Sequence, residues 1–189
     1  MDILGIWYVV TVLGAPEYWG FATLGLIAVY FALRYMIPEN PNWKKVKPAF
    51  KKFLLVFVPS IALFFVLTLS IKTFWFVQRP CLPCPAAGCN PFCDLDSSFP
   101  SGHSGTIFVA FSSFYLAFRK RMKKDGLSRS YKAVNPRSLL LLFILPVLVS
   151  FSRIALGVHT WIDVLAGAFL GLVIPFIVSI IMQKKYKSR

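Results

Sequence analysis

Six apolar segments, separated by short polar stretches, constrain this chain more than any other feature of its sequence. A helix needs about 20 apolar residues to cross the hydrocarbon core of a bilayer, and the second, third and sixth segments reach that length. A hydrophobic content of 57% and a mean hydropathy of +0.68 lie outside the usual range of soluble domains. The sequence therefore predicts an all-α integral membrane bundle of about six helices, with five clear spans and a short N-terminal hydrophobic helix. The predicted segments are residues 3–14, 19–37, 53–77, 102–118, 138–151 and 161–182.

Three of these segments are short for a membrane crossing. As a helix, residues 3–14 would rise only about 18 Å, whereas the hydrocarbon core is about 30 Å thick. This segment fits a re-entrant or interfacial helix, and the sequence leaves open whether it spans. Residues 102–118 and 138–151 need flanking residues to cross, and Pro146 is expected to kink the second of these segments.

Basic residues are concentrated between the apolar segments, at residues 44–52, 119–137 and 184–189, and they carry the net charge of +14. A nucleic-acid binder would instead gather basic and aromatic residues on a soluble patch. Lys and Arg are typical of cytoplasmic loops, which predicts a multi-pass protein of the cell (cytoplasmic or inner) membrane. Both termini are then cytoplasmic if the first segment crosses. Residues 1–189 are expected to form one domain without a cleaved signal peptide, because no repeat, linker or charged N-terminal region is found.

A few basic side chains lie at the opposite, outer ends of the spans. In this topology Lys72, Arg79 and Arg153 are the only Lys or Arg residues away from the cytoplasmic side, and both histidines, His103 and His159, accompany them. A positive-inside bias would remove such residues. Ionisable residues within membrane segments are commonly functional, so this group indicates a site for an anionic ligand.

These residues form three short motifs: K-x6-R-P from Lys72, P-S-G-H ending at His103, and S-R-x5-H-x3-D ending at Asp163. In this order, the motifs resemble those of the type 2 phosphatidic acid phosphatase superfamily, which contains membrane lipid phosphatases, bacterial acid phosphatases and vanadium haloperoxidases. The resemblance covers residues 72–163, and the six-segment layout extends it to nearly the whole chain. It implies a membrane lipid phosphatase that forms a phosphohistidine intermediate at His159.

The residue types also suit phosphate chemistry on physical grounds. Phosphoryl transfer depends on positioning and on stabilising charge that is spread over several oxygens. Arg79 and Arg153 can each donate two parallel hydrogen bonds to a phosphate, and Lys72 can supply a point charge. Ser101 and Gly102 begin the fourth span, where backbone N–H groups and the helix dipole favour an anion.

The two histidines are expected to have different roles. His159 and Asp163 are four residues apart at the start of the last span and so share one helix face. Asp163 is expected to accept the proton of one ring nitrogen of His159, which leaves the other nitrogen as the nucleophile. His103 is expected to protonate the leaving oxygen and then to activate water. This scheme needs no metal and no cofactor, and the outer face lacks the carboxylate cluster that magnesium prefers.

Taken alone, each residue also has an ordinary structural explanation. A histidine in a span often bonds two helices together, and Lys72 or Arg153 could be an anchor that snorkels to the interface. The complete set favours a functional site. Ser152, in contrast, is expected only to brace the adjacent loop, and Gly157 to permit a backbone turn.

A Cys-rich extracytoplasmic loop, residues 80–99, holds all four cysteines, Cys81, Cys84, Cys89 and Cys93. The spacing C-x2-C-x4-C-x3-C is compatible with zinc or an iron–sulfur cluster. Disulfides persist outside the cytoplasm, so two disulfides are preferred over a structural metal, and three pairings are possible. Asp94 and Asp96 are expected to solvate this loop or to steer a polar head group.

The predicted substrate is a phosphomonoester or pyrophosphate of a lipid at the outer leaflet. Within the resembling family, the candidates are undecaprenyl pyrophosphate, phosphatidylglycerol phosphate, phosphatidic acid and the 1-phosphate of lipid A, and the sequence does not separate them. A membrane thiol-disulfide oxidoreductase using Cys81 and Cys84 would leave the basic and histidine residues unexplained. A non-catalytic lipid binder or scramblase would not need His103, His159 and Asp163 together. The sequence fixes no oligomeric state.

Overall fold

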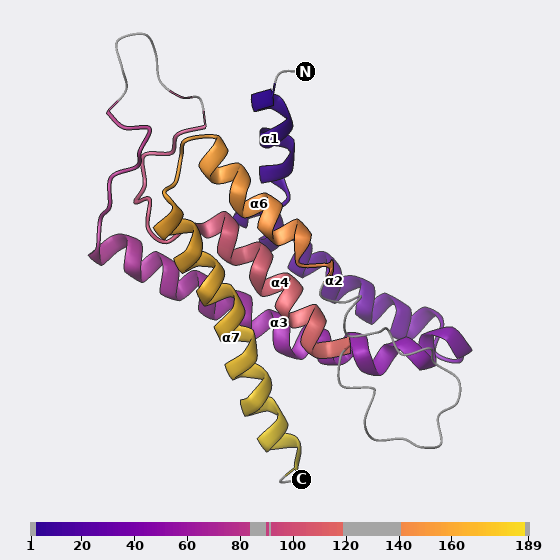
Figure 1. Ribbon diagram of the computed structural model, residues 1–189. Coiled ribbons are helices and arrows are strands. Elements are labelled where there is room, and N and C mark those ends of the chain that lie inside the picture. The colour runs from indigo at the N-terminus through magenta and orange to yellow at the C-terminus, as the bar shows by residue number, and fades with distance from the viewer. Residues whose placement is uncertain (1–2, 84–89, 91, 119–140, 188–189) are drawn as a thin grey trace.

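The computed structural model describes residues 3–83, 90, 92–118 and 141–187, and the regular secondary structure of this part of the chain is entirely helical (Figure 1). The predicted all-α fold is thus confirmed for these residues. The basic cluster at residues 119–137 lies outside them, as do Cys84 and Cys89. The helices are α1 (Ile3–Val12), α2 (Pro16–Met36), α3 (Pro41–Phe74), α4 (Gly102–Phe118), α6 (Ile144–Ala155) and α7 (Trp161–Lys187).

α3 begins at Pro41, well before the predicted start at residue 53. The Asn40 side chain caps this helix by accepting hydrogen bonds from the backbone N–H groups of Asn42 (2.9 Å) and Trp43 (3.2 Å). Pro41 occupies the first helical position, where its missing N–H is not needed. Because Lys is a good helix former, the basic residues 44–52 extend the helix. The prediction that they form a loop was wrong.

α4 is the central helix of the bundle and packs against α7, α3, α6 and α2 (Figure 1). Most of its residues are buried, including the small polar residues Ser104, Thr106, Ser112 and Ser113. A helix enclosed by other helices does not face lipid, so it can carry more polar side chains than its neighbours. The position of α4 therefore accounts for its sequence.

Glycines allow α4 and α7 to approach each other closely. A side chain at Gly167 of α7 would meet the backbone oxygen of Ser101 and, at 3.2 Å, the backbone nitrogen of Gly105. A side chain at Gly171 would meet the backbone oxygen of Gly105. Small residues permit such close contact between membrane helices. As a result, the start of α4 lies directly against the first half of α7.

We expect Gly167→Ala to destabilise the folded protein by about 1–3 kcal/mol, as is usual for an overpacked contact. The added methyl group would press on the backbone at Ser101, which cannot rotate away as a side chain can. Thermal unfolding in detergent measures the effect. Gly25→Ala in α2 is the control, because no atom lies within 4 Å of its added Cβ. Equal melting temperatures for the two variants would contradict the close packing.

The end of the bundle where α3 ends and α4 and α7 begin is called here the motif end. α1 lies at this end, beside the last turns of α6 (Figure 1). The ring of Trp7 packs edge-on against Phe151 at 5.3 Å, and the ring of Tyr8 stacks on Phe92 of the Cys-rich loop at 4.9 Å. With ten residues, α1 rises only about 15 Å. It is therefore an extension of α2 at the motif end and not a separate crossing.

α6 is shifted toward the motif end relative to the predicted segment 138–151. It begins at Ile144, so Pro146 lies in its first turn, where a proline does not interrupt the helix. Leu141 is helical and residues 142–143 form a turn before α6 begins, so the predicted segment 138–151 is interrupted one turn ahead of Pro146, as expected of a proline. α6 continues to Ala155, which places Arg153 in its last turn. Gly157 follows with a φ of 68°, and this confirms its predicted role in a backbone turn.

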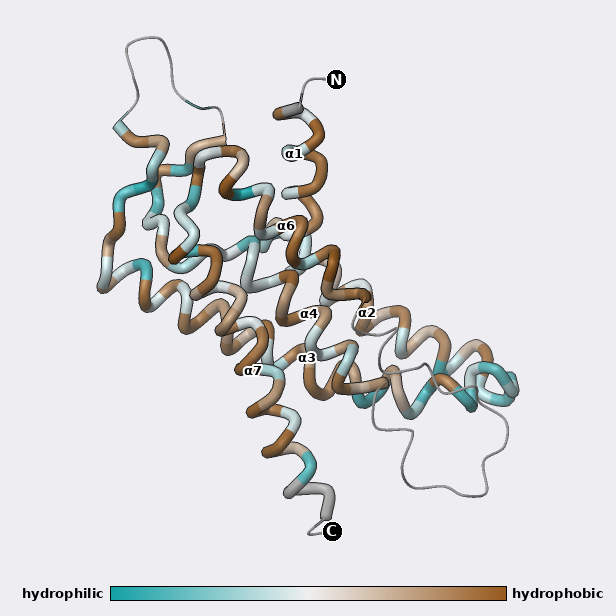
Figure 2. Tube along the Cα trace, in the orientation of Figure 1, coloured by the Kyte–Doolittle hydropathy of each residue, from teal (hydrophilic) through white to brown (hydrophobic). Residues whose placement is uncertain are grey.

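Hydrophobic residues predominate along the middle of the helices, and hydrophilic residues gather toward the two ends of the bundle (Figure 2). Within the part of the chain that the structure describes, three stretches are long and apolar enough to cross a membrane: Leu4–Met36, Pro41–Phe74 and Trp161–Gln183. Of the five clear spans predicted, three thus meet the length criterion, while α4 and α6 are shorter helices. The described lysines of residues 44–52 lie near the start of α3, at the end opposite the motif end.

Candidate active site

The three sequence motifs meet at the motif end of the bundle. Helix termini carry Lys72 (last turn of α3), His103 (second residue of α4), Arg153 (last turn of α6) and Asp163 (first turn of α7), and loops carry Arg79 and His159. His103 interacts electrostatically with Arg153, His159 and Arg79. Residues far apart in the sequence thus form one cluster of charged and titratable groups.

Arg79 is positioned by hydrogen bonds between two parts of the loop that joins α3 to α4. The backbone N–H of Val77 donates to Ser97 Oγ (3.0 Å), and the N–H of Ser98 donates to the Val77 carbonyl (2.8 Å). The Arg79 side chain then points inward and is only 3% exposed. Its Nη1 lies 3.4 Å from the Val158 carbonyl and 3.2 Å from Nε2 of His159.

A serine connects His159 to Asp163. His159 Nδ1 lies 3.6 Å from Asp163 Oδ2 and 3.2 Å from Ser98 Oγ, and Ser98 Oγ donates to Asp163 Oδ2 at 2.5 Å. A guanidinium has no acceptor, so Nε2 must accept the hydrogen bond from Arg79 and the ring proton must lie on Nδ1. The chain of hydrogen bonds therefore runs from Nδ1 through Ser98 to Asp163, and the Nε2 lone pair faces Arg79.

The pKa of His159 is lowered from its ordinary value. Burial of the imidazole is the main cause, and the positive charges of Arg79 and Arg153 add to it, while Asp163 opposes the shift without cancelling it. A lowered pKa keeps the ring neutral at a pH where an exposed histidine would already be protonated. His159 thus has the protonation state that a nitrogen nucleophile requires.

This protonation state can be measured because the chain has only two histidines. In His103→Asn, the remaining imidazole is that of His159, and its NMR signals can be titrated in detergent micelles. We expect a midpoint below the ordinary value of about 6.5, since a proton binds less readily to a buried ring beside two arginines. The same signal in denaturant is the control and should titrate near 6.5. A folded-state midpoint above that value would contradict the assigned surroundings of His159.

The start of α7 is fixed by a reciprocal cap that also involves Asp163. The backbone N–H of Thr160 donates to Asp163 Oδ2 (2.7 Å), and the N–H of Asp163 lies 3.4 Å from Thr160 Oγ1. This T-x-x-D arrangement resembles a capping box. Asp163 therefore holds the first turn of α7 and, through Ser98, orients the His159 ring.

The backbone at the start of α4 is partly used in packing. The Ser101 N–H donates to the Asp163 carbonyl (3.0 Å), and the Ser101 carbonyl accepts from Gly105 (3.1 Å). The Ser101 N–H, which the sequence suggested as a donor to an anion, therefore already donates to the Asp163 carbonyl. Gly102 and His103 begin the helix, where N–H groups have no intrahelical acceptor, so these two positions can offer backbone donors to an anion.

The turn between α1 and α2 supports the helical turn that carries His103. Thr106 Oγ1 donates to the Gly14 carbonyl at 2.8 Å. A side chain at Gly14 would meet the His103 backbone oxygen at 2.9 Å. This close contact joins the N-terminal helices to the candidate site.

Arg153 lies deep in the site and contacts α1. Its Nη1 donates to Thr11 Oγ1 at 3.1 Å. Its Nε is buried and has no hydrogen-bond partner among the described residues. A buried guanidinium donor without a partner is costly, so Nε is suited to receive an oxygen of an anionic ligand.

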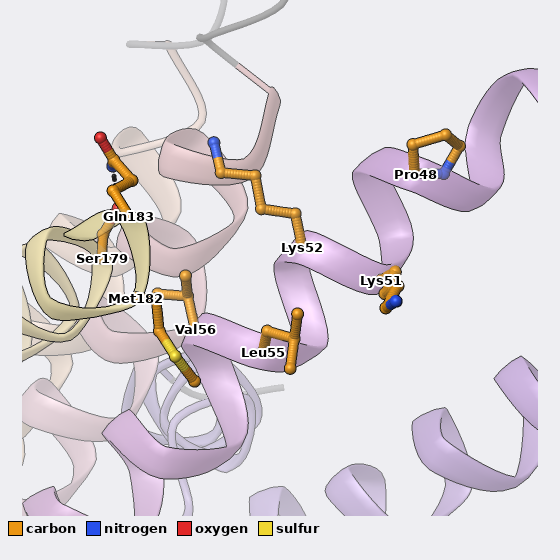
Figure 3. Close-up of a pocket in the computed structure, with 8 residues that line it drawn as sticks. All are labelled: Pro48, Lys51, Lys52, Leu55, Val56, Ser179, Met182 and Gln183. Atoms are coloured by element: carbon orange, nitrogen blue, oxygen red, sulfur yellow. Dashed lines mark hydrogen bonds between the residues drawn. The ribbon is translucent and has the colours of Figure 1, made fainter. Parts of the chain in front are cut away.

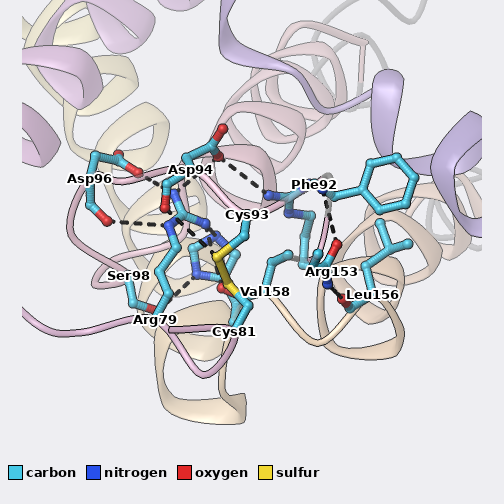
Figure 4. Close-up of a disulfide and its surroundings, with 12 residues drawn as sticks. Arg79, Cys81, Phe92, Cys93, Asp94, Asp96, Ser98, Arg153, Leu156 and Val158 are labelled. Atoms are coloured by element: carbon cyan, nitrogen blue, oxygen red, sulfur yellow. Dashed lines mark hydrogen bonds and ion pairs between the residues drawn. A yellow bond between two sulfur atoms is a disulfide. The ribbon is translucent and has the colours of Figure 1, made fainter. Parts of the chain in front are cut away.

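Two carboxylates of the Cys-rich loop lie over the basic residues (Figure 4). Asp96 forms ion pairs with Lys72 and Arg79. Asp94 lies 3.2 Å from Arg79 Nη2 and 3.9 Å from Arg153 Nη2. Burial of the Asp96 carboxyl opposes its ionisation, but hydrogen bonds from Lys72 and Arg79 outweigh this effect and lower its pKa.

A disulfide joins Cys81 to Cys93, with 6.1 Å between the two Cα atoms. This bond links the residue that follows Pro80 to the residue before Asp94 (Figure 4). Because Cys81 pairs with Cys93, the proposed redox pair of Cys81 with Cys84 is contradicted, and neither Cys81 nor Cys93 is free to bind a metal.

Sequence reasoning did not identify all of these contacts. Ser98 was missed because nothing in the sequence distinguishes it from Ser97, and Thr11 was missed because it lies outside the three motifs. Asp94 and Asp96 were noted, but only as solvating or steering groups. Ser152 donates to the Val149 carbonyl (2.6 Å) within α6, so its expected role in bracing the adjacent loop stays a prediction.

Two apolar cavities lie away from this charged cluster. One, of about 390 Å³, lies between α3 and α7 and is lined by residues that include Lys52, Leu55, Met182 and Gln183 (Figure 3). The other, of about 470 Å³, is lined by α2, α3 and α4 together with Leu142. Neither is lined by a residue of the three motifs, so any reaction at the motif end uses them only indirectly.

Comparisons with known proteins agree with this arrangement. The model of the PAP2 superfamily matches residues 53–187. The crystal structure of LpxE from Aquifex aeolicus is similar in fold, with 24% identity, a TM-score of 0.60, and coverage of 93% of this chain and 84% of that one. The crystal structure of a transmembrane PAP2-type phosphatidylglycerolphosphate phosphatase from Bacillus subtilis is 26% identical, with a TM-score of 0.60 and coverage of 96% and 77%.

No curated protein matches the sequence at a significant level. The family match alone covers most of the chain, and it includes every residue of the three motifs. Together with the helices that are long enough to span, it identifies a multi-pass membrane protein with a phosphatase fold. The chain belongs to the PAP2 superfamily.

Proposed function

We propose that this protein hydrolyses the phosphomonoester or pyrophosphate of a membrane lipid through a phosphohistidine at His159. The observation that carries the proposal is the position of His159 Nε2, which lies 3.2 Å from Arg79 Nη1 while Nδ1 is held through Ser98 and Asp163. The lone pair of a neutral imidazole thus faces the group that would bind the phosphate. This is the arrangement that an activated nitrogen nucleophile requires.

The reaction has two steps in this proposal. Nε2 of His159 attacks phosphorus, the bond from phosphorus to the lipid oxygen breaks, and His103 gives its proton to that oxygen. His103 then takes a proton from water, the water oxygen attacks phosphorus, and the bond from phosphorus to Nε2 breaks, releasing phosphate. Each step uses one proton transfer by a positioned acid or base.

The basic residues stabilise the charge on the transferred group. Arg79 and Arg153 donate to the equatorial oxygens, Lys72 adds a positive charge, and the N–H groups at the start of α4 provide further donors. Ser101 contributes by holding this turn against α7. In the proposed mechanism, the positive charge that stabilises the transferred phosphate comes from side chains of the protein, so no metal ion is required.

The apolar cavity of about 470 Å³ supports a lipid as the substrate. It lies among helices of the membrane bundle and is lined by side chains that include Trp19, Ala22, Phe53 and Phe111. Ala110 and Phe118, which also line it, are about 10 and 22 Å along α4 from His103. An acyl tail can therefore lie in this cavity while its head group is at the motif end. We place the motif end on the extracytoplasmic side, opposite the lysines of residues 44–52.

Among lipids, phosphatidylglycerol phosphate is one candidate, since one similar structure is a phosphatase of that lipid. Undecaprenyl pyrophosphate, phosphatidic acid and lipid A 1-phosphate present the same terminal phosphate. Every protein contact assigned above goes to phosphate oxygens. We therefore propose that the site is specific for the terminal phosphate and tolerates several lipid head groups.

Phosphate release from a panel of purified lipid phosphates tests this function. We expect hydrolysis of long-chain lipids and slower hydrolysis of a short-chain analogue with the same head group. Ala22→Trp should raise the KM for the long-chain lipid several-fold by filling the cavity. Ala28→Trp is the matched control, because Ala28 is an exposed position on the same helix and does not line the cavity. Absence of phosphate release from every lipid would refute the proposed function.

A further inference from the structure

The two arginines at the motif end are buried, but the carboxylates that pair with them are exposed. The Arg79 and Arg153 side chains are 3% and 4% exposed, whereas the Asp94 side chain is 62% exposed. Asp94 therefore approaches the two guanidinium groups from the solvent side of the site. A phosphate must approach the same donors, and it needs the position between Arg79 and Arg153 that Asp94 occupies in Figure 4.

We propose that Asp94 is an internal competitor for the phosphate site, which the substrate must displace to engage Arg79 and Arg153 together. This inference rests on the proposed function, since it concerns the same phosphate. Asp94 has the weaker hold of the two carboxylates: its contacts to Arg79 and Arg153 are 3.2 and 3.9 Å long. Asp96 has additional bonds to Lys72 and, through its carbonyl, to Arg79 Nε (3.2 Å). Asp96 thus remains in place and positions Lys72 and Arg79.

The charge of the ligand decides whether it can replace Asp94. A carboxylate carries one negative charge, and a phosphodiester head group also carries one. A terminal phosphate carries about −1.5 to −2 at neutral pH. Against two buried guanidinium groups, the additional charge is worth more than it would be in water. Both anions must displace Asp94 to bind, and a terminal phosphate does so more readily because it binds the two arginines more tightly than a phosphodiester does.

The disulfide keeps the competitor close to the site. Cys93 is the residue before Asp94, and its bond to Cys81 anchors it to the segment that carries Arg79. A tethered group acts at a high effective concentration. Asp94 can move aside when a phosphate binds, but it cannot leave the neighbourhood. Phosphodiester lipids are abundant in a membrane, and this tethered carboxylate would hold their binding below a useful affinity.

Displacement makes a quantitative prediction that repulsion does not make. If Asp94 leaves the arginines whenever an anion binds, it weakens all anions by the same factor. If Asp94 stays beside the bound anion, it repels a dianion more than a monoanion. If Asp94 is displaced, neutralising it should tighten the binding of monoanions and dianions by the same factor. If Asp94 stays in place, neutralising it should tighten the binding of dianions more.

The experiment compares two soluble lipids with identical tails, dioctanoyl phosphatidic acid and dioctanoyl phosphatidylglycerol, together with inorganic phosphate as a probe without a tail. Binding is measured by titration calorimetry at about pH 8, where both a phosphomonoester, with a second pKa of about 6, and inorganic phosphate are mainly dianions. Every protein in this experiment also carries the substitution His159→Ala, so that no ligand is hydrolysed. We expect Asp94→Asn to lower all three dissociation constants by about two- to fivefold, the effect of an exposed ion pair worth about 0.4–1 kcal/mol. Asp94→Ala, a second neutral variant, should agree.

Glu39→Gln is the control, since Glu39 pairs with Lys44 near the start of α3 and carries the same charge as Asp94. It should change none of the dissociation constants. Weaker binding in Asp94→Asn would overturn the proposal, because Asp94 would then position the arginines. Tightening confined to phosphatidic acid and inorganic phosphate would also overturn it, because Asp94 would then stay in place. If the probes bind as expected but the enzyme with His159 hydrolyses no lipid phosphate, the proposed function fails while the competition stands. If no probe binds to any variant, both fail.

Discussion

Replacing His159 with Ala should lower the turnover of lipid phosphates by at least about 10³-fold, because it removes the proposed nucleophile. The side chain is almost completely buried, with Nδ1 held through Ser98 and Nε2 beside Arg79, so no neighbouring group can take its place. Phosphate release from the preferred lipid of the panel measures the loss. A second readout is trapping of a phosphoenzyme in acid-labile form, which should disappear in the variant.

Ser152→Ala is the control for the His159 variant, since Ser152 is also buried, but among the described residues its hydroxyl bonds only to the Val149 carbonyl of α6 (2.6 Å). Its turnover should stay within a few-fold of the unmodified protein. Thermal unfolding of each variant separates loss of chemistry from loss of fold. Normal turnover in a folded His159→Ala protein would show that another residue is the nucleophile.

His103→Asn should produce a loss that depends on the leaving group. A general acid contributes about 10²–10⁴-fold, so hydrolysis of a lipid with a poorly leaving alkoxide should fall by that amount. An aryl phosphate, whose phenolate leaves without protonation, should still phosphorylate His159 at a rate close to normal. Rapid-quench measurement of phosphoenzyme formation distinguishes this first step from the hydrolysis that follows.

The second step provides the check on His103. If His103 also activates water, the phosphoenzyme formed from the aryl phosphate should accumulate in His103→Asn, because its hydrolysis is slowed. The unmodified protein is the reference for both rates. Equal losses for alkyl and aryl substrates in the first step would contradict the role of His103 as an acid and would indicate that it only helps to hold the site together.

The sequence predicted the helical membrane fold, because apolar segments and basic clusters report the environment of each part of the chain directly. It also predicted which residues gather at one end, since each motif lies at the end of an expected helix. It did not predict the link between His159 and Asp163. A spacing of four residues places both on one helix face, but His159 precedes α7, and Ser98 from a distant loop completes the connection.

Other differences have equally specific causes. The start of α3 was misplaced because hydrophobicity alone ignores the cap at Asn40 and the helix propensity of lysine. The role of α1 could not be inferred, because its contact to the site is one hydroxyl group, Thr11 Oγ1, beside Arg153. The position of Asp94 depends on the folding of a loop around a disulfide, and four cysteines allow three pairings.

The close contact between α4 and α7 has a consequence for how such a protein can diversify. The backbone at Ser101 is bonded to Asp163, and Gly167 lets the two helices touch, so main-chain atoms set the spacing between the helix that carries His103 and the one that follows His159. The Ser104 hydroxyl of α4 adds one further bond, to the Val164 carbonyl of α7 (2.9 Å). Under the proposed function, changes in the cavity of about 470 Å³ or in the Cys-rich loop would therefore alter which lipid is accepted while the reacting groups keep their alignment. Substrate preference and chemical competence would then be separable.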